Sequence, residues 1–384
     1  MSRHALMFAA VAVLFCPAAA VLAQTGSVDF QGPSSLVHGG ALSAGDLLLP
    51  TPPAPGPGPL PLPSVAIPWN FLGLLSGPIQ DLELDALSFG ADVPQGPVLV
   101  FSVDEHAIGS PWAWPDVSTE GAAGATEASA DVFLSSPAPW LAPPPWMAGP
   151  IVGNTNVMDG DGLASTSGSM PPGIGLVEPN PPNFGIPDVG DNLDALDDSQ
   201  PTFPVFFSLD AAFADPLEPG ANSGSAAANG FSGADVLVSP GGSTSVYAPA
   251  FILGLDLQGT DTDDLDALLL WDDGDLEFGP GDFLAFSVRR GSAVIGTADS
   301  LWGVPIEPGD VLVPSVLAGL PAGAPPAIAI FAEAIGLATV RSGLVNYGDD
   351  LDALDAVVPE PSSLSLLAGL AGFAALALWR RRSR

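Results

Sequence analysis

Short signatures that recur in a fixed cyclic order constrain the fold of this 384-residue chain more than any other feature of its sequence. The first is Leu-Asp-Ala-Leu, the second is a small residue followed by Asp and two apolar residues, and the third is an apolar residue followed by Gly and Leu. Each occurs four times, with about 40 to 46 residues from the first signature to the second, which indicates internal structural repeats. The first signature begins at Leu84, Leu193, Leu265 and Leu351, the second at Gly45, Ala130, Ala234 and Gly309, and the third at Leu72, Ile174, Leu253 and Ile335.

The segments around these signatures favour β-strands. The runs PVLVFSVD, FPVFFSLD and DFLAFSVRR are short, rich in Val and Phe, and bounded by Gly, Pro or Asp; they share a Phe-Ser pair at Phe101, Phe207 and Phe286. The second signature predicts a strand that a Pro or Gly turn ends. The third signature lies in the apolar runs APAFILGLDL and AIAIFAEAIGLATV. Residue preference also allows a helix in the second run, but its match to FILGLDL favours a further strand, which we expect there.

The two ends of the repeat region complement each other. Residues 27–80 contain the second and third signatures but no Leu-Asp-Ala-Leu, whereas the Leu-Asp-Ala-Leu at Leu351 has no further signature after it. Joined, they make one complete repeat, which is typical of a closed ring whose last unit is shared between the termini. We therefore predict an all-β fold over residues 27–356, a repeat-built four-bladed β-propeller, with a row of β-sandwich or solenoid units as the alternative. The expected blades are residues 349–356 with 27–80, then 81–190, 191–262 and 263–348.

The charge balance excludes some classes of function. The formal net charge is −35 and there is no lysine, so that Arg289, Arg290 and Arg341 are the basic residues of the predicted propeller. Such a protein repels phosphate backbones, which argues against nucleic-acid binding, and it attracts cations. Because 47% of the residues are hydrophobic, the chain can still bury a substantial core.

The repeated aspartates of the first signature are candidate ligands for a cation. Alternation along a strand would place Leu and Ala on one face, and Asp with the final Leu on the other. If this strand is innermost in each blade, four carboxylates would surround one tunnel and repel, and calcium would relieve the repulsion; the alternative is that each Asp accepts hydrogen bonds from nearby backbone amides. The candidate ligands are Asp85, Asp194, Asp266 and Asp352, with Asp263, Asp264, Asp349 and Asp350 expected within reach.

Motifs for catalysis are missing from the sequence. His38 and His106, the histidines beyond the first residues, have no neighbouring motif of a Ser-His-Asp triad, and there is no phosphate loop, His-Glu-x-x-His or dinucleotide fingerprint. We therefore expect no enzyme and no required cofactor. Four tryptophans could stack on the sugars of an exopolysaccharide, although packing against neighbouring prolines is the alternative we favour: Trp112, Trp114, Trp140 and Trp146.

The first residues predict a secretory signal. Residues 1–23 combine Arg3, an apolar stretch, and small residues before Gln24, so signal peptidase is expected to cleave after Ala23. This segment holds the one cysteine of the chain, Cys16, and the mature protein is therefore expected to have no disulfide.

The last residues, 358–384, form a second targeting segment. Pro359, Glu360 and Pro361 precede an apolar run from Leu364 to Trp379. This run is somewhat shorter than the roughly 20 residues that span a bilayer comfortably, and a transmembrane helix over 364–379 would cross a thin membrane. The basic residues that follow it would stop it on the cytoplasmic side: Arg380, Arg381, Arg382 and Arg384.

This order of Pro-Glu-Pro, hydrophobic helix and arginine cluster resembles the PEP-CTERM sorting signal of exported bacterial proteins. The resemblance implies export across the inner membrane, transient anchoring, and processing near Pro-Glu-Pro by an exosortase. We therefore predict an exported surface or extracellular-matrix protein with a structural or binding role, located finally at the cell surface or outside the cell. A secreted carbohydrate-binding or carbohydrate-active protein is the alternative.

Overall fold

The computed structural model describes the following ranges: 24–28, 32–33, 42–50, 63–69, 72–74, 84–88, 99–104, 107, 117–118, 128–135, 154–162, 171–177, 191–198, 203–210, 224–343 and 345–356. Thr25–Asp355 forms one compact unit, and Met1–Gln24 with Ala356–Arg384 forms another. No helix within the described ranges is long and apolar enough to cross a membrane. Several sequence predictions concern residues outside these ranges: the signal peptide (1–23), the sorting signal with its helix (358–384), the two histidines and the four tryptophans named above.

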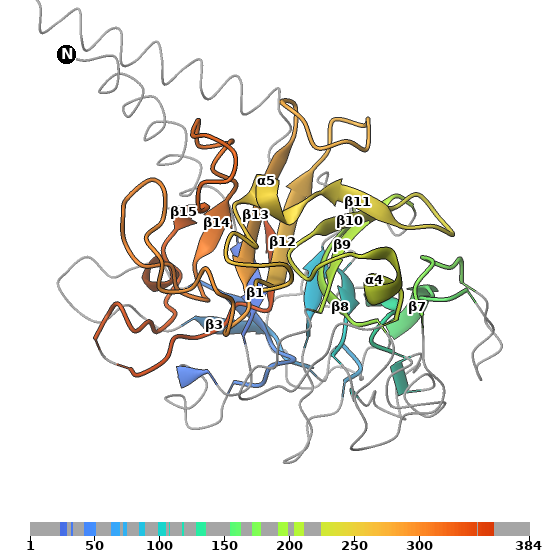
Figure 1. Cartoon of the computed structure of the whole chain (residues 1–384). Helices are drawn as coiled ribbons and strands as arrows, with labels where there is room; N and C mark the ends of the chain where they lie inside the picture. Colours follow the sequence, from blue (N-terminus) through green and yellow to red (C-terminus); the bar gives the residue numbers. More distant parts are fainter. Residues whose placement is uncertain are drawn as a thin grey trace, which may run out of the picture. The chain divides into compact units, whose positions relative to one another are not determined.

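The unit Thr25–Asp355 contains four sheets of four strands each (Figure 1). Blade 1 consists of β16 (Ala353–Ala356), β1 (Gln24–Ser27), β2 (Leu47–Leu49) and β3 (Ser64–Ile67). Blade 2 consists of β4 (Ala86–Ser88), β5 (Leu99–Ser102), β6 (Val132–Ser135) and β7 (Asn154–Met158). Blade 3 consists of β8 (Leu193–Asp198), β9 (Val205–Leu209), β10 (Val236–Ser239) and β11 (Ser245–Ala248). Blade 4 consists of β12 (Leu265–Trp271), β13 (Phe283–Val288), β14 (Val311–Val313) and β15 (Ala327–Ile330).

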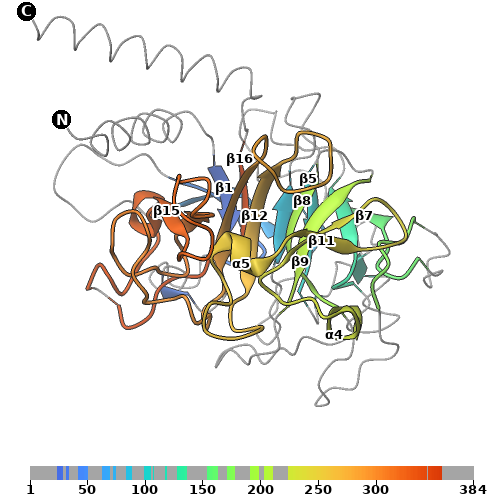
Figure 2. The same ribbon diagram turned by 45° about the horizontal axis from the view of Figure 1, so that its top comes forward.

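These sheets form a four-bladed β-propeller, as the sequence predicts. In each blade the strand of the first signature is at one edge, and the Phe-Ser strand or its equivalent, the strand of the second signature and an outer strand follow in order. The first strands β4, β8 and β12 contact one another. In blade 1 this first strand is β16, from the far end of the chain, and Figure 2 shows it in red beside the blue β1. The two ends of the repeat region therefore complete one blade together, which confirms the predicted closure.

The strand β1 was not predicted from the sequence. It occupies the place of the Phe-Ser strands, but Gly26 and Ser27 stand where the other blades have Phe and Ser. A Cβ atom on Gly26 would lie 2.6 Å from the carbonyl oxygen of Ala353. The closing strand approaches so closely that only glycine fits at this position.

In blades 3 and 4 the third signature ends a helical turn, so the predicted strand at FILGLDL was wrong. Helix α5 (Ala250–Leu253) ends at Gly254, and the 3-10 helix η4 (Ala332–Ala334) directly precedes Ile335. The outer strands β11 and β15 come just before these turns. A left-handed glycine stops a regular strand at the signature in every blade: φ is 80° at Gly73, 96° at Gly175, 88° at Gly254 and 92° at Gly336.

Buried apolar clusters fill the faces between neighbouring blades. Leu84 and Leu87 pack into a cluster with residues of blade 1, whereas Ala86 packs into a cluster with residues of blade 3. The two leucines of the signature therefore share a face and the alanine lies on the other, which corrects the alternation expected from the sequence. Irregular pairing in the equivalent strands, between Leu193 and Leu196 and between Leu265 and Ala267, turns the side chains away from simple alternation.

Candidate functional site

One hydrogen bond recurs at every junction between blades. The serine of the second strand of each blade donates its Oγ–H to the main-chain carbonyl of the first leucine of Leu-Asp-Ala-Leu in the next blade. All four serines are fully buried, and the last bond runs from blade 4 back to blade 1, so the bonds form a closed circuit. The oxygen-to-oxygen distances are 2.9 Å for Ser27 to Leu84, 3.1 Å for Ser102 to Leu193, 3.1 Å for Ser208 to Leu265 and 2.6 Å for Ser287 to Leu351.

The aspartates of the second signature support the backbone. Asp235 shows the pattern: its Oδ2 accepts a hydrogen bond from the Ser232 amide at 3.1 Å, and its Oδ1 accepts one from the Ala250 amide at 2.8 Å. Each such carboxylate holds the turn before its own strand together with the segment that follows the outer strand. The equivalent pairs of amides are Ser43 and Trp69 for Asp46, and Glu307 and Ala332 for Asp310; Asp131 instead binds the Gly160 amide and the Asn156 side chain.

A second set of aspartates lies two residues before each Leu-Asp-Ala-Leu of blades 3, 4 and 1. Each accepts a hydrogen bond from the amide of the residue that follows the third signature. The distances to the carboxylate oxygen are 2.8 Å for Val177 to Asp191, 2.7 Å for Asp256 to Asp263 and 2.5 Å for Ala338 to Asp349. Asp263 and Asp349 were predicted to lie within reach of a cation. In the structure, each already has a carboxylate oxygen that accepts a hydrogen bond from a backbone amide.

The aspartates within the first signature are buried side chains in a crowded electrostatic environment. Asp85, Asp194, Asp266 and Asp352 are 5–7% exposed. Burial, followed by the charges of Asp264, Asp210 and Asp85, raises the pKa of Asp194 well above its ordinary value. Burial, followed by the charges of Asp350, Asp352 and Asp194, does the same to the pKa of Asp266. The charge of Asp85 thus acts on Asp194, and the charges of Asp194 and Asp352 act on Asp266, so these aspartates of neighbouring blades lie near one another where the inner strands meet.

Two arginines lie among these acids. The Nη1 atom of Arg289 is 3.3 Å from Asp210 Oδ1 and 3.3 Å from Asp264 Oδ2. Arg290 donates its backbone amide to Asp350 Oδ2 at 2.7 Å and its guanidinium lies 3.7 Å from the same oxygen. We call Asp194, Asp210 and Asp264, which converge at the junction of blades 3 and 4, the axial triad.

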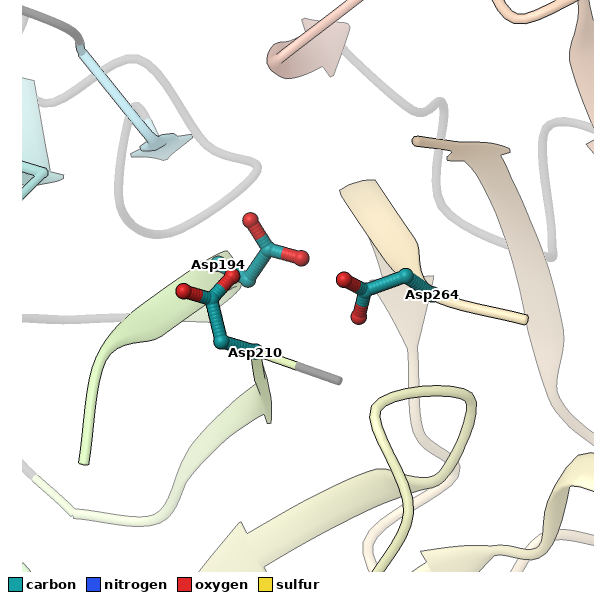
Figure 3. Close-up of side chains that lie close together, drawn as sticks. All are labelled: Asp194, Asp210 and Asp264. Carbon is teal, nitrogen blue, oxygen red and sulfur yellow. The ribbon is translucent and has the colours of Figure 1, made fainter. Parts of the chain in front are cut away.

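The axial triad brings one carboxylate oxygen of each residue within 4.8 Å of the others (Figure 3). Asp194 and Asp264 were predicted near a cation, but Asp210 was missed. It directly follows the Phe-Ser strand β9 in FPVFFSLD. An acid directly after FSV or FSL also occurs at Asp104, so this position carried a signal that could have been recognised.

Arg341 is the third arginine of the propeller, and it is also paired internally. Its Nη2 atom lies 2.7 Å from Asp310 Oδ1 and 2.8 Å from Glu333 Oε2, and its guanidinium lies 5.1 Å from the ring centre of Phe331. The side chain of Asp310 is fully buried, so this fork neutralises a carboxylate that has no access to water. All three arginines of the propeller thus serve in internal ion pairs.

Comparison with known proteins adds one finding at the end of the chain. No curated protein and no solved structure matches the chain. A family model described as the PEP-CTERM protein-sorting motif matches residues 357–382, which include Pro359, Glu360 and Pro361. This match confirms the resemblance seen in the sequence. The chain therefore carries a PEP-CTERM protein-sorting motif at its C-terminal end, the mark of an exported protein that an exosortase processes.

Proposed function

We propose that this protein is a structural or binding component of the cell surface or extracellular matrix, released there as a closed propeller after removal of its sorting motif. The observation that carries the proposal is the motif at residues 357–382, which begins directly after the closing strand β16. Processing near Pro359 would leave the whole of blade 1 in the mature protein.

The internal bonding of the propeller supports a role outside the cell. Four buried serine bonds and three internally paired arginines hold it together without a disulfide among the described residues. Because all three arginines form internal ion pairs, the charged groups that remain for a partner are acidic. Such a surface suits interaction with cations or with cation-bridged anionic polymers rather than with nucleic acid.

Replacement of Pro359, Glu360 and Pro361 by alanine tests the sorting part of the proposal. In a host with an exosortase, we expect the variant to accumulate as membrane-bound precursor, whereas the natural chain is released or displayed at the surface. Cell fractionation with mass determination of the mature C-terminus measures both. Equal release of the two proteins would contradict the proposal.

A secreted carbohydrate-binding protein is the second candidate, and one side chain favours it. Trp302 is 54% exposed, and its indole Nε1 is held by the Ile328 carbonyl at 3.0 Å, so its ring is presented in a fixed orientation. An exposed, held indole can stack on a sugar ring. A glycan array with the natural protein and Trp302→Ala tests this, with Phe251→Ala as control because Phe251 is an equally exposed aromatic at 57%. Binding lost only in Trp302→Ala would favour the second candidate, and turnover of a glycan would overturn the non-catalytic proposal.

A further inference from the structure

We propose that the axial triad, Asp194, Asp210 and Asp264, binds one divalent cation, with calcium as the ion that fits best. Figure 3 shows the three carboxyl groups turned toward one another. One oxygen of each residue lies within 4.8 Å of the other two. Two oxygens that bind the same calcium ion at about 2.4 Å cannot be more than about 4.8 Å apart, so the spacing admits a single shared ion.

A buried carboxylate oxygen of Asp194 points independently to a bound cation. Asp194 is 5% exposed, and among the described residues its Oδ2 atom has no hydrogen-bond donor. A buried carboxylate oxygen normally accepts several hydrogen bonds or binds a metal, because burial without either is costly. The aspartates of the second signature, each of which accepts two hydrogen bonds, show what a satisfied carboxylate looks like in this fold.

The charges of the triad do not balance internally. Among the described residues, two of the three carboxylates, those of Asp210 and Asp264, form ion pairs with the same guanidinium, that of Arg289, so negative charge is in excess there. Burial and the neighbouring acids therefore raise the pKa of Asp194. A divalent cation would offset the excess negative charge, and a donor set made only of carboxylate oxygens selects a hard ion.

The neighbouring junctions show why the site forms between blades 3 and 4. At the junction of blades 2 and 3, Asn192 stands where blade 4 has Asp264, and its Nδ2 donates to Asp104 at 3.3 Å and to Asp210 at 3.2 Å. At the junction of blades 4 and 1, Arg289 takes the place that Asp210 has in blade 3. The sequence suggested a symmetric ring of four equivalent aspartates; the site we propose uses one member of that ring and two acids from adjacent strand ends.

Calcium titration of the metal-stripped mature protein tests the proposal. The protein is treated with EDTA, dialysed, and melted with calcium chloride or magnesium chloride. We expect calcium at about 100 times its dissociation constant to raise the melting temperature by about 3–6 °C, and magnesium to act more weakly because it needs shorter ligand distances. The variant is Asp194→Asn, which keeps the shape of the side chain and removes one charge.

Asp275→Asn is the matched control. Asp275 is exposed and belongs to an acidic group with Asp273, also exposed, and the half-buried Asp272; this group could bind calcium weakly at the surface. We expect this control to keep the full response to calcium. Without metal, Asp194→Asn should melt no lower than the natural protein, because an uncompensated buried charge has been removed, and its calcium response should fall at least tenfold in affinity.

Three outcomes would overturn the proposal. One is an unchanged melting temperature of the natural protein on addition of calcium. Another is an equal calcium response of Asp194→Asn and the natural protein, which would place binding on other acids. The third is a metal-free Asp194→Asn that melts well below the natural protein, which would show that Asp194 has a purely structural role. None of these results bears on sorting, so the proposed function is tested separately.

Discussion

The serine bonds between blades should be a major source of stability for the closed ring, and Ser287→Ala tests this at the junction that the C-terminal strand closes. The Ser287 Oγ atom lies 2.6 Å from the Leu351 carbonyl oxygen, and both residues are at most 3% exposed. Alanine fills nearly the same volume but cannot donate. The variant therefore isolates the hydrogen bond from packing.

The expected magnitude follows from burial. A typical hydrogen bond contributes about 1 kcal/mol net, but removal of one partner in a dry interior costs about 1–3 kcal/mol because the other is left without water. We expect the free energy of unfolding to fall by about 1–3 kcal/mol. For a domain of this size, that corresponds to a decrease in melting temperature of roughly 2–6 °C.

Urea unfolding followed by tryptophan fluorescence measures the loss, with Ser64→Ala as the control. The Ser64 Oγ atom also bonds to a carbonyl, that of Leu49, but the bond is exposed and long at 3.5 Å. Water can replace such a bond, so the control should change stability by less than about 0.5 kcal/mol. An equal effect of the two substitutions, or no effect of Ser287→Ala, would refute the view that buried bonds between blades hold the ring.

Three further predictions concern other parts of the propeller. Gly254→Ala should destabilise by roughly 3 kcal/mol or more in urea, because Gly254 has a φ of 88° and a Cβ there would lie 2.2 Å from a carbonyl oxygen; Gly274→Ala, at a φ of 102° with open space, should lose only about 1 kcal/mol. Arg341→Met should lose about 3 kcal/mol because it leaves the buried carboxylate of Asp310 and the half-buried one of Glu333 without their counter-charge, and a loss below 1 kcal/mol would contradict this. Because the folded-state pKa of Asp194 is raised, the metal-free protein should be most stabilised by this group below about pH 4 and lose that contribution as pH rises through the folded value. Urea unfolding in EDTA should show that the free energy of unfolding falls less between pH 4 and 8 for Asp194→Asn than for the natural protein. Identical profiles of stability against pH for the two proteins would argue against a strained buried carboxylate at Asp194.

The repeat pattern allowed the architecture to be predicted because it reports the periodic unit directly. The strands of the Phe-Ser pair and of the second signature formed where their apolar runs predicted. Closure could be predicted because complementary fragments stand at the two ends of the repeat region. By contrast, β1 has the sequence QTGS, with no apolar run, and forms a strand because its neighbours β16 and β2 pair with it on both sides.

The finer features depended on contacts that no local pattern reveals. The third signature was expected to be a strand on hydrophobicity, but the left-handed glycine at its centre interrupts a strand and, in blade 3, caps a helical turn. The recurring Ser of the Phe-Ser pair was visible in the sequence, yet its acceptor lies in the next blade. For the same reason Asp210 was missed. Asp194, 16 positions before it, lies near it because β8 pairs with β9 in blade 3, and Asp264, 54 positions after it, meets it only when blades 3 and 4 pack together.

Amide hydrogen exchange of the mature protein, read out for the segment Thr25–Ser27, tests the central claim most directly. In the closed ring β1 lies between β16 and β2, and its amides should exchange about as slowly as those of β13. Deletion of Gly348–Ala356, which removes β16, should return the segment to rapid exchange and promote aggregation through the exposed edge. Rapid exchange of Thr25–Ser27 in the intact mature protein, or unchanged protection after the deletion, would contradict a propeller completed by both ends of the repeat region.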